Sequence, residues 1–159
     1  MGVLINSSDF VGDLAVSLNK FNEQSFKDFI IEQEVYYLYL IVGEELGDLI
    51  LLTPTDPDYV KILLPFSFQR GLRVHQSYGL KKTIAMYIRS IWLHKTQSKV
   101  TLAGVGTGAG DNTLISSQSL FIGWNDATKS ARSVQQYCMD NRSKYSEFNR
   151  TDIPYNHNA

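Results

Sequence analysis

The amino-acid sequence predicts a mainly α-helical fold: a small helical bundle with a short β-hairpin or loop excursion between its last two long helices. Apolar residues recur every three or four positions over several long stretches, which is the period of an amphipathic helix. Residues that break helices fall between these stretches. A length of 159 residues with 43% hydrophobic and 19% charged side chains is typical of one folded domain, so we treat residues 1–159 as a single domain.

The N-terminal part is expected to form two helices. Residues 6–9 include side chains that cap helices, and they predict a two-turn helix over residues 10–18. Asn22 is expected to cap a longer helix that runs to Val42, and Gly43 interrupts it. The inward face of this longer helix is predicted to comprise Phe26, Phe29, Ile30, Gln33, Tyr37, Leu40 and Ile41.

The next segment is predicted to form shorter elements. A further helix is expected over Glu44–Leu52, and the run from Thr53 to Asp58, with two prolines, predicts a turn. Residues 59–64 favour a short helix that ends near Pro65. Residues 66–78 give no clear prediction.

The clearest helical pattern covers Gly79–Gln97, with Leu80, Ile84, Tyr87, Ile88, Ile91 and Trp92 on its inward face. Residues 100–102 predict a short strand that could pair with Leu114 and Ile115. A glycine-rich loop follows within residues 103–113, and then a long helix over residues 119–148. An extended tail is expected over residues 151–159. The inner face of the last helix is predicted to comprise Phe121, Trp124, Thr128, Ala131, Val134, Cys138, Tyr145 and Phe148.

Acidic and basic residues are concentrated in different parts of the chain. Residues 1–60 contain eleven Asp and Glu against two Lys, an excess of nine negative charges. Residues 61–110 contain eight Lys and Arg and no acid, and the last 49 residues hold five of each sign, so the net charge is only −1. An asymmetry of this size indicates an association surface rather than a particular fold.

Several functional classes are not favoured. No stretch approaches the roughly 18 apolar residues of a membrane span, and the first residues lack the pattern of a secretory signal. The lone cysteine, Cys138, cannot form an internal disulfide, and its place on an apolar helix face predicts a core residue. His75, His94 and His157 are scattered without metal or triad spacing, so we expect no enzyme, metal or cofactor.

The glycine-rich loop does not match a phosphate-binding motif. A P-loop needs Lys and then Ser or Thr after its last glycine, whereas Asp111 and Asn112 follow here. A dinucleotide fingerprint must open a helix directly after a strand within a parallel βαβ unit, and no such unit is predicted, because no acid lies about 20 residues further on in a second strand. A flexible interaction loop is therefore the better interpretation.

The basic segment allows three interpretations. It could be a solvated helix face, or it could bind the phosphates of DNA as part of a DNA-binding accessory protein. In the third interpretation, the acidic face of one subunit meets the basic face of the next, and repetition of this contact closes a ring. The interface candidates are then Glu32, Glu44, Glu45, Asp48, Arg70, Arg73, Lys81, Lys82, Arg89, Gly104, Gly106, Gly108 and Gly110.

The order of several motifs resembles a known family. The first helix carries Phe29-Ile30-Ile31-Glu32 and Tyr36-Tyr37-Leu38, and Val42-Gly43-Glu44-Glu45-Leu46 follows it. Further motifs are Tyr59-Val60-Lys61-Ile62-Leu63-Leu64-Pro65, Ile84-Ala85-Met86-Tyr87, Val100-Thr101-Leu102-Ala103-Gly104-Val105, and a last helix with Tyr137 and Tyr145. Together they resemble the small head–tail connector (adaptor) proteins of tailed bacteriophages, especially those that infect Bacteroides-type gut bacteria. Residues 66–78 depart from the family pattern.

The resemblance implies a mainly helical subunit without a catalytic residue. It also implies a cyclic homo-oligomer of about a dozen copies docked beneath the portal protein. Further expected partners are tail or other neck proteins, and genomic DNA that passes through the lumen. The expected location is the neck of the virion, assembled in the cytoplasm of the bacterial host, with no membrane contact.

Overall fold

The computed structural model describes residues 4–16, 18, 22–97, 100–101, 104–105 and 117–149. Within these residues the chain forms five α-helices, two short 3-10 helices and two antiparallel two-stranded hairpins. The predicted fold class, mainly helical with a small hairpin between the last two long helices, is confirmed. No helix in the described part of the chain is long and apolar enough to cross a membrane.

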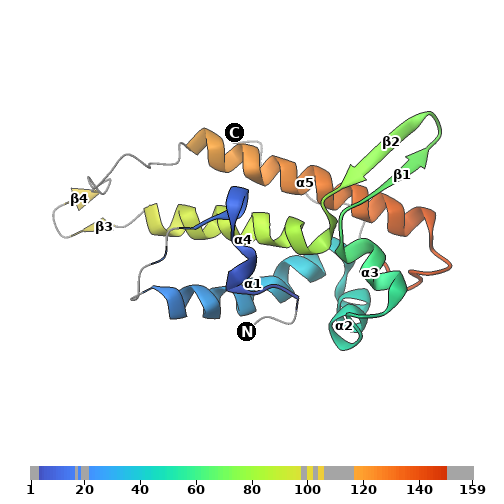
Figure 1. Ribbon diagram of the computed structural model, residues 1–159, viewed down its shortest axis with the longest axis horizontal. Coiled ribbons are helices and arrows are strands. Elements are labelled where there is room, and N and C mark those ends of the chain that lie inside the picture. Colours follow the sequence, from blue (N-terminus) through green and yellow to red (C-terminus); the bar gives the residue numbers. More distant parts are fainter. Residues whose placement is uncertain are drawn as a thin grey trace.

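Helix α4 lies at the centre of the bundle. It packs against α5 on one side and α1 on the other, and the short helices α2 and α3 close one end (Figure 1). The bounds of the helices are α1 Glu23–Val42, α2 Glu44–Leu52, α3 Pro57–Leu63, α4 Gly79–Gln97 and α5 Ser117–Asp140. The predicted helices over 22–42, 44–52 and 79–97 are confirmed, and the one predicted over 59–64 begins two residues earlier.

Gly43 and the Asp56-Pro57 pair determine where α1, α2 and α3 begin and end. Gly43 has a φ of +90°, a conformation that side chains with a Cβ rarely adopt, and it separates α1 from α2. Asp56 is the N-cap of α3, because its carboxylate accepts the backbone N–H of Asp58 at 2.9 Å. Pro57 then occupies the first turn, where its missing N–H has no consequence. These three helices therefore follow one another with sharp changes of direction.

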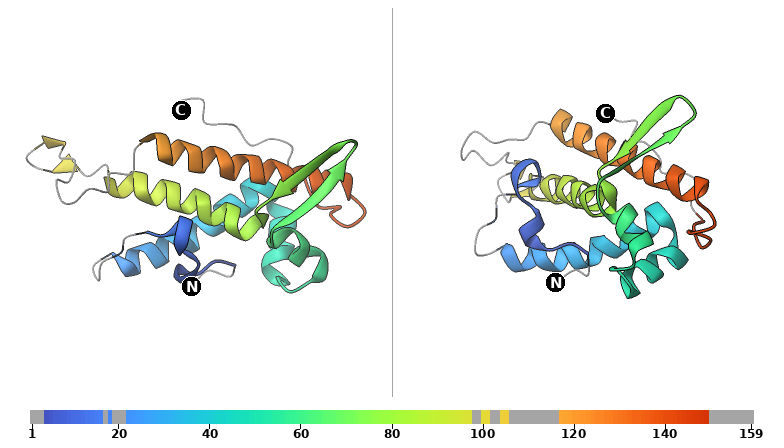
Figure 2. Two further views of the ribbon diagram at one scale, coloured as in Figure 1. Left: turned by 45° about the horizontal axis from the view of Figure 1, so that its top comes forward. Right: turned by 45° about the vertical axis from the view of Figure 1, so that its right-hand side comes forward.

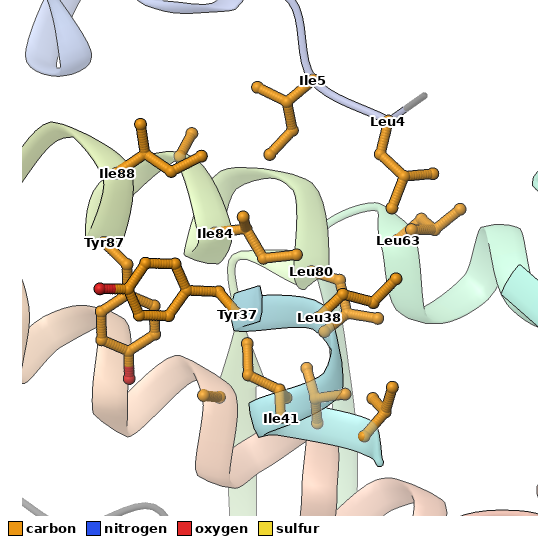
Figure 3. Close-up of a cluster of buried hydrophobic side chains, with 14 of the residues drawn as sticks. Leu4, Ile5, Tyr37, Leu38, Ile41, Leu63, Leu80, Ile84, Tyr87 and Ile88 are labelled. Carbon is orange, nitrogen blue, oxygen red and sulfur yellow. The ribbon is translucent and has the colours of Figure 1, made fainter. Parts of the chain in front are cut away.

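The core is formed where α1, α4 and α5 meet. Tyr37 of α1 stacks on Tyr87 of α4 with ring centroids 4.8 Å apart, and Trp124 of α5 packs edge-on against Tyr87 at 4.6 Å. Leu38 and Ile84 are fully buried in the same cluster (Figure 3). Each buried side chain of this size stabilises the fold by about 1.5–3 kcal/mol.

The segment that precedes α1 differs from its prediction. A helix was expected over residues 10–18, but the chain forms 3-10 turns at Ser7–Asp9 (η1) and Gly12–Leu14 (η2). Gly12 has a φ of +57°, which interrupts any regular helix there. The buried Glu34 carboxylate of α1 accepts the backbone N–H of Ile5 at 2.7 Å and of Leu4 at 3.1 Å. The segment is therefore a strap that is held by a distant side chain.

Residues 66–78, which gave no prediction, form a β-hairpin. Strand β1 spans Phe66–Arg70 and β2 spans Arg73–Ser77, and the facing pair of Arg70 and Arg73 leaves Gly71 and Leu72 as the turn. Gly71 has a φ of +60°, as the first residue of a tight hairpin turn requires. At the base, the ring of Phe66 lies 4.9 Å from that of Tyr137 on α5. The hairpin projects from the bundle past α5 (Figure 2).

The C-terminal helix is shorter than predicted. It ends at Asp140 and not at Phe148, because the Asn141 side chain donates to the carbonyl of Tyr137 at 2.8 Å and turns replace the helix. Tyr145 and Phe148 are still buried, and the hydroxyl of Tyr145 donates to a backbone carbonyl of α3 at 2.7 Å.

A second small hairpin lies between α4 and α5. Strand β3, Val100–Thr101, pairs with β4, Gly104–Val105. Leu114 and Ile115, the expected partner of β3, lie outside the described residues, as do residues 151–159 of the predicted tail.

Candidate subunit interface

The outer side of α2 carries three carboxylates and one apolar side chain. Glu44, Glu45, Asp48 and Leu52 are all exposed, and their spacing places them on one face of the helix. The opposite side of α2 is buried, with Ile50 inaccessible to solvent. We call the surface formed by Glu44, Glu45, Asp48 and Leu52 the acidic face. Leu52 is 76% exposed, so the acidic face offers a partner an apolar side chain as well as negative charge.

Helix α1 continues this negative surface. Asp28 and Glu32 are exposed and four residues apart, and the exposed side chain of Tyr36 follows at the same spacing. The hydroxyl of Tyr39, one further turn along, donates to the Asp48 carboxylate of α2. This hydrogen bond, together with the nearby negative charge, raises the pKa of Tyr39. The acids of the two helices therefore lie on the same side of the molecule.

Other acids of residues 1–60 have structural roles inside the chain. Glu34 holds the strap, Asp56 caps α3, and Asp9 accepts the backbone N–H of Asn6 at 2.8 Å. Asp58 pairs with Lys144 at 2.8 Å. The excess of negative charge counted from the sequence is thus larger than the charge available to a partner.

The tip of the β1–β2 hairpin carries the basic residues that project furthest. Arg70 and Arg73 are exposed and face each other across the strands. Arg70 also forms an exposed ion pair with Asp140 of α5, with 3.4 Å between Nε and Oδ2. Leu72 in the turn is fully exposed, and Val74 beside it is 67% exposed. We call Arg70, Leu72, Arg73 and Val74 the hairpin tip.

The basic residues of α4 do not form one continuous stripe. Lys81 is exposed, whereas Lys82 is half-buried with its ammonium 4.9 Å from the centre of the Tyr78 ring. Arg89 donates from Nε to the carbonyl of Ala15 at 3.2 Å. Partial burial lowers the pKa of Arg89, and the nearby Asp13 carboxylate opposes this effect. Arg89, a predicted interface residue, is therefore engaged within the subunit.

The acidic and basic surfaces lie on different sides of the subunit. Helix α2 lies at the bottom of the molecule in Figure 1 and the hairpin extends to the top, both at the same end of the bundle; the views of Figure 2 agree. Four ion pairs occur between described side chains, and none of these four joins an acid of residues 1–60 to a base of residues 61–110. The four are Lys27–Glu23, Arg70–Asp140, Lys129–Asp126 and Lys144–Asp58.

Most of the glycine-rich loop falls outside the described residues. Of its four candidate glycines, Gly104 begins strand β4, whereas Gly106, Gly108 and Gly110 belong to the part of the chain that the structure does not describe. The expected role of this loop in a subunit contact stays a prediction.

No family model, curated protein or solved structure matches this chain. The surfaces of the subunit, together with the resemblance of its motifs, are therefore what support a functional proposal.

The described histidines lie far from each other. His75 is in β2, where its ring stacks on Phe68 at 5.2 Å, whereas His94 lies near the other end of α4, about 22 Å from Gly79 along the helix axis. His157 is outside the described residues. No group of three or more His, Cys, Asp or Glu side chains that could hold a metal ion occurs among the described residues.

A groove of about 570 Å³ lies at the base of the hairpin. Its floor includes Ser130, whose hydroxyl lies 2.9 Å from that of Ser77 and 2.6 Å from that of Thr83. Its two charged lining residues, Asp126 and Lys129, pair with each other at 3.5 Å. These hydroxyls link the end of β2 to α4 and α5, so we assign them a structural role.

The exposed apolar residues of both surfaces were not predicted from the sequence. Leu52 was counted only as part of a helix, and Leu72 lay in a segment without a prediction. The run Arg70-Gly71-Leu72-Arg73, flanked by Phe66 and Phe68 at alternate positions, was the available signal of a hairpin.

Proposed function

We propose that this chain is a ring-forming structural protein of a tailed bacteriophage, which connects the portal at the head to the tail. The observation that supports the proposal most directly is the separation of charge: helix α2, which carries the acidic face, and the basic hairpin tip lie at the bottom and the top of one subunit in Figure 1. Attraction between copies is then strongest when unlike surfaces meet, head to tail.

A head-to-tail contact of this kind favours a ring over a two-fold dimer. In a two-fold dimer each surface faces its own copy unless the patches cross over, so the acidic faces would repel each other. An open head-to-tail chain leaves one acidic and one basic surface unused at its two ends, and closure into a ring satisfies both. Exposed ion pairs contribute only about 0.2–1 kcal/mol each, so the exposed Leu52 and Leu72 are important to the contact.

The proposed location in the phage neck is based on a resemblance to connector proteins. The motifs around Val42-Gly43-Glu44 and Ile84-Ala85-Met86-Tyr87 carry this resemblance. On this proposal about a dozen copies form a ring beneath the portal. The ring leaves a lumen through which the genome passes and offers a surface to tail or neck proteins. No catalytic step is required of any residue.

The decisive experiment is quantitative mass spectrometry of purified virus particles. The number of copies per particle should match that of the portal protein, as expected for two stacked rings. Electron microscopy of the same particles should place it in the neck. Its presence only in soluble host fractions, and not in particles, would refute the proposal.

A solution experiment tests the electrostatic part. Reversal of two charges by Lys81→Glu with Lys82→Glu should weaken assembly, and added salt should weaken it in the wild type, because exposed charges are screened within about 8–10 Å at physiological salt. Unchanged assembly would show that these lysines do not contribute to the contact.

The competing interpretation, a DNA-binding accessory protein, has less support from the geometry. Lys61, Lys82 and Lys95 each lie over an aromatic ring, and Arg89 donates to a backbone carbonyl. DNA binding by the isolated subunit with a steep salt dependence, which implies contacts to several phosphates, would favour this interpretation instead.

A further inference from the structure

The β1–β2 hairpin packs on the bundle through its base, and nearer the tip only the exposed ion pair of Arg70 with Asp140 of α5 is seen among the described side chains. Within the described residues the sheet has two strands, so each strand keeps one edge without a β partner there. Phe66 and Phe68 hold the base, with ring centroids 4.9 and 5.4 Å from that of Tyr137. An isolated two-stranded hairpin is only marginally stable in water, so the outer half of this one gains most if a partner covers it.

The composition of the tip is that of a protein contact. Leu72 is fully exposed and Val74 is 67% exposed, and Arg70 and Arg73 flank them. Arginine around an apolar centre is enriched at protein interfaces. Contact with phosphates alone would leave Leu72 and Val74 in water, so DNA does not explain this surface.

We propose that the hairpin tip of one subunit docks on the acidic face of α2 in a neighbouring copy of the same chain. The two surfaces are complementary in charge, with Arg70 and Arg73 against Glu44, Glu45 and Asp48. They are also complementary in apolar character, because each has one strongly exposed leucine, Leu72 at the tip and Leu52 on α2.

Helix α2 and the hairpin tip lie at the bottom and the top of the molecule in Figure 1, so the proposed contact joins two copies and repeats around a ring (Figures 1 and 2). This inference rests on the proposed function. It is narrower, because it assigns the direct contact to the hairpin tip and leaves the lysines of α4 to contribute only through longer-range attraction.

Cross-linking of full-length variants tests the contact directly. One chain carries Leu72→Cys and the other, isotopically labelled, carries Leu52→Cys; both keep Cys138, which is fully buried and does not react with a maleimide in the folded protein. A short bis-maleimide should give a mixed product that joins the two different chains. A matched control pairs Leu72→Cys with Ile122→Cys, an exposed apolar residue on α5, and should give no mixed product. Products that join only two Leu72→Cys chains would overturn the inference.

Substitutions at the tip provide the second measurement. Leu72→Ser should lower the self-association constant by at least about tenfold, since an apolar side chain no longer leaves water. Because Leu72 has no buried surface in the subunit, the fold should not change. Ile122→Ser should leave self-association unaltered.

A charge exchange completes the test. Arg73→Glu and Glu45→Arg should each weaken self-association several-fold, and the two together should restore most of it. Self-association that is insensitive to all of these changes would overturn the inference while the ring proposal stands. A wild-type chain that is absent from particles and monomeric at every concentration would overturn both.

Discussion

Removal of the Glu34 carboxylate should release the N-terminal strap. This buried side chain of α1 accepts two backbone N–H groups, from Ile5 at 2.7 Å and Leu4 at 3.1 Å, and both bonds go to the same oxygen. A buried donor without a partner costs about 1–3 kcal/mol. We therefore expect Glu34→Ala to lower the free energy of unfolding by about 4 kcal/mol for the two donors together.

Glu34→Gln is the matched control. The amide oxygen of glutamine can accept both N–H groups, and only the assistance of the charge is lost. Hydrogen bonds to a charged group are roughly twice as strong as neutral ones, but a neutral amide is also less costly to bury. Glu34→Gln should therefore lower the free energy of unfolding by at most about 2 kcal/mol, about half of the loss expected for Glu34→Ala.

Two measurements check this prediction. Guanidinium unfolding followed by far-ultraviolet circular dichroism gives the free energy of unfolding of each variant. Hydrogen exchange at the amides of Leu4 and Ile5 shows whether the strap opens before the bundle does. If Glu34→Ala stays within about 1 kcal/mol of the wild type and the exchange of Ile5 is unchanged, the carboxylate does not hold the strap and the reasoning is wrong.

Three further predictions concern the bundle. Gly79→Ala should lower the free energy of unfolding by more than Gly12→Ala, because both residues have positive φ but only at Gly79 would a Cβ overlap backbone atoms, those of Leu64; thermal unfolding of both variants gives the comparison, and equal losses would contradict it. Burial raises the pKa of the Cys138 thiol to about 12, above the ordinary value of about 8.5. The stability that the neutral thiol contributes is therefore complete below pH 8.5 and is lost as the pH rises towards 12. Between pH 8 and 9.5 the free energy of unfolding should fall by about 1 kcal/mol more in the wild type than in Cys138→Ala, and identical slopes would argue against burial as the cause. Tyr145→Phe should cost about 1 kcal/mol, since its hydroxyl is the donor to a backbone carbonyl of α3; denaturant midpoints indistinguishable from the wild type would show that this bond adds nothing.

Local sequence signals were sufficient where a helix is held by its own amphipathic face. Helix α4 begins and ends at the predicted residues, Gly79 and Gln97, because a long run of apolar residues at helical spacing faces both α1 and α5. The break at Gly43 was also predictable, since glycine is the residue that tolerates the positive φ found there.

The errors have a common origin in contacts between residues distant in sequence. The strap was predicted as a helix, but its backbone is fixed by Glu34, 29 residues after Ile5. Tyr145 and Phe148 extended the apolar pattern of α5 past its true end, since they are buried by turns and not by a helix. Tertiary contacts override local propensity in these places.

The candidate interface was predictable in its charges but not in its shape. The sequence separated acids from bases, and Glu44, Glu45 and Asp48 do lie together on α2. What could not be predicted was that Arg73 projects on a hairpin arm with Leu72, because residues 66–78 mix strand-forming and polar residues in a short run.

The two tryptophans of the chain lie in different helix interfaces, which gives the protein two built-in optical reporters. Trp92 of α4 packs on Phe26 and Phe29 of α1, at 4.9 and 5.4 Å, whereas Trp124 of α5 packs on Tyr87 of α4. The fluorescence of a Trp92→Phe variant then reports the surroundings of Trp124, where α5 meets α4 and Tyr37 of α1, and that of Trp124→Phe reports the α1–α4 interface. Emission spectra of the two variants, recorded during mixing with denaturant, would reveal which half of the bundle separates first.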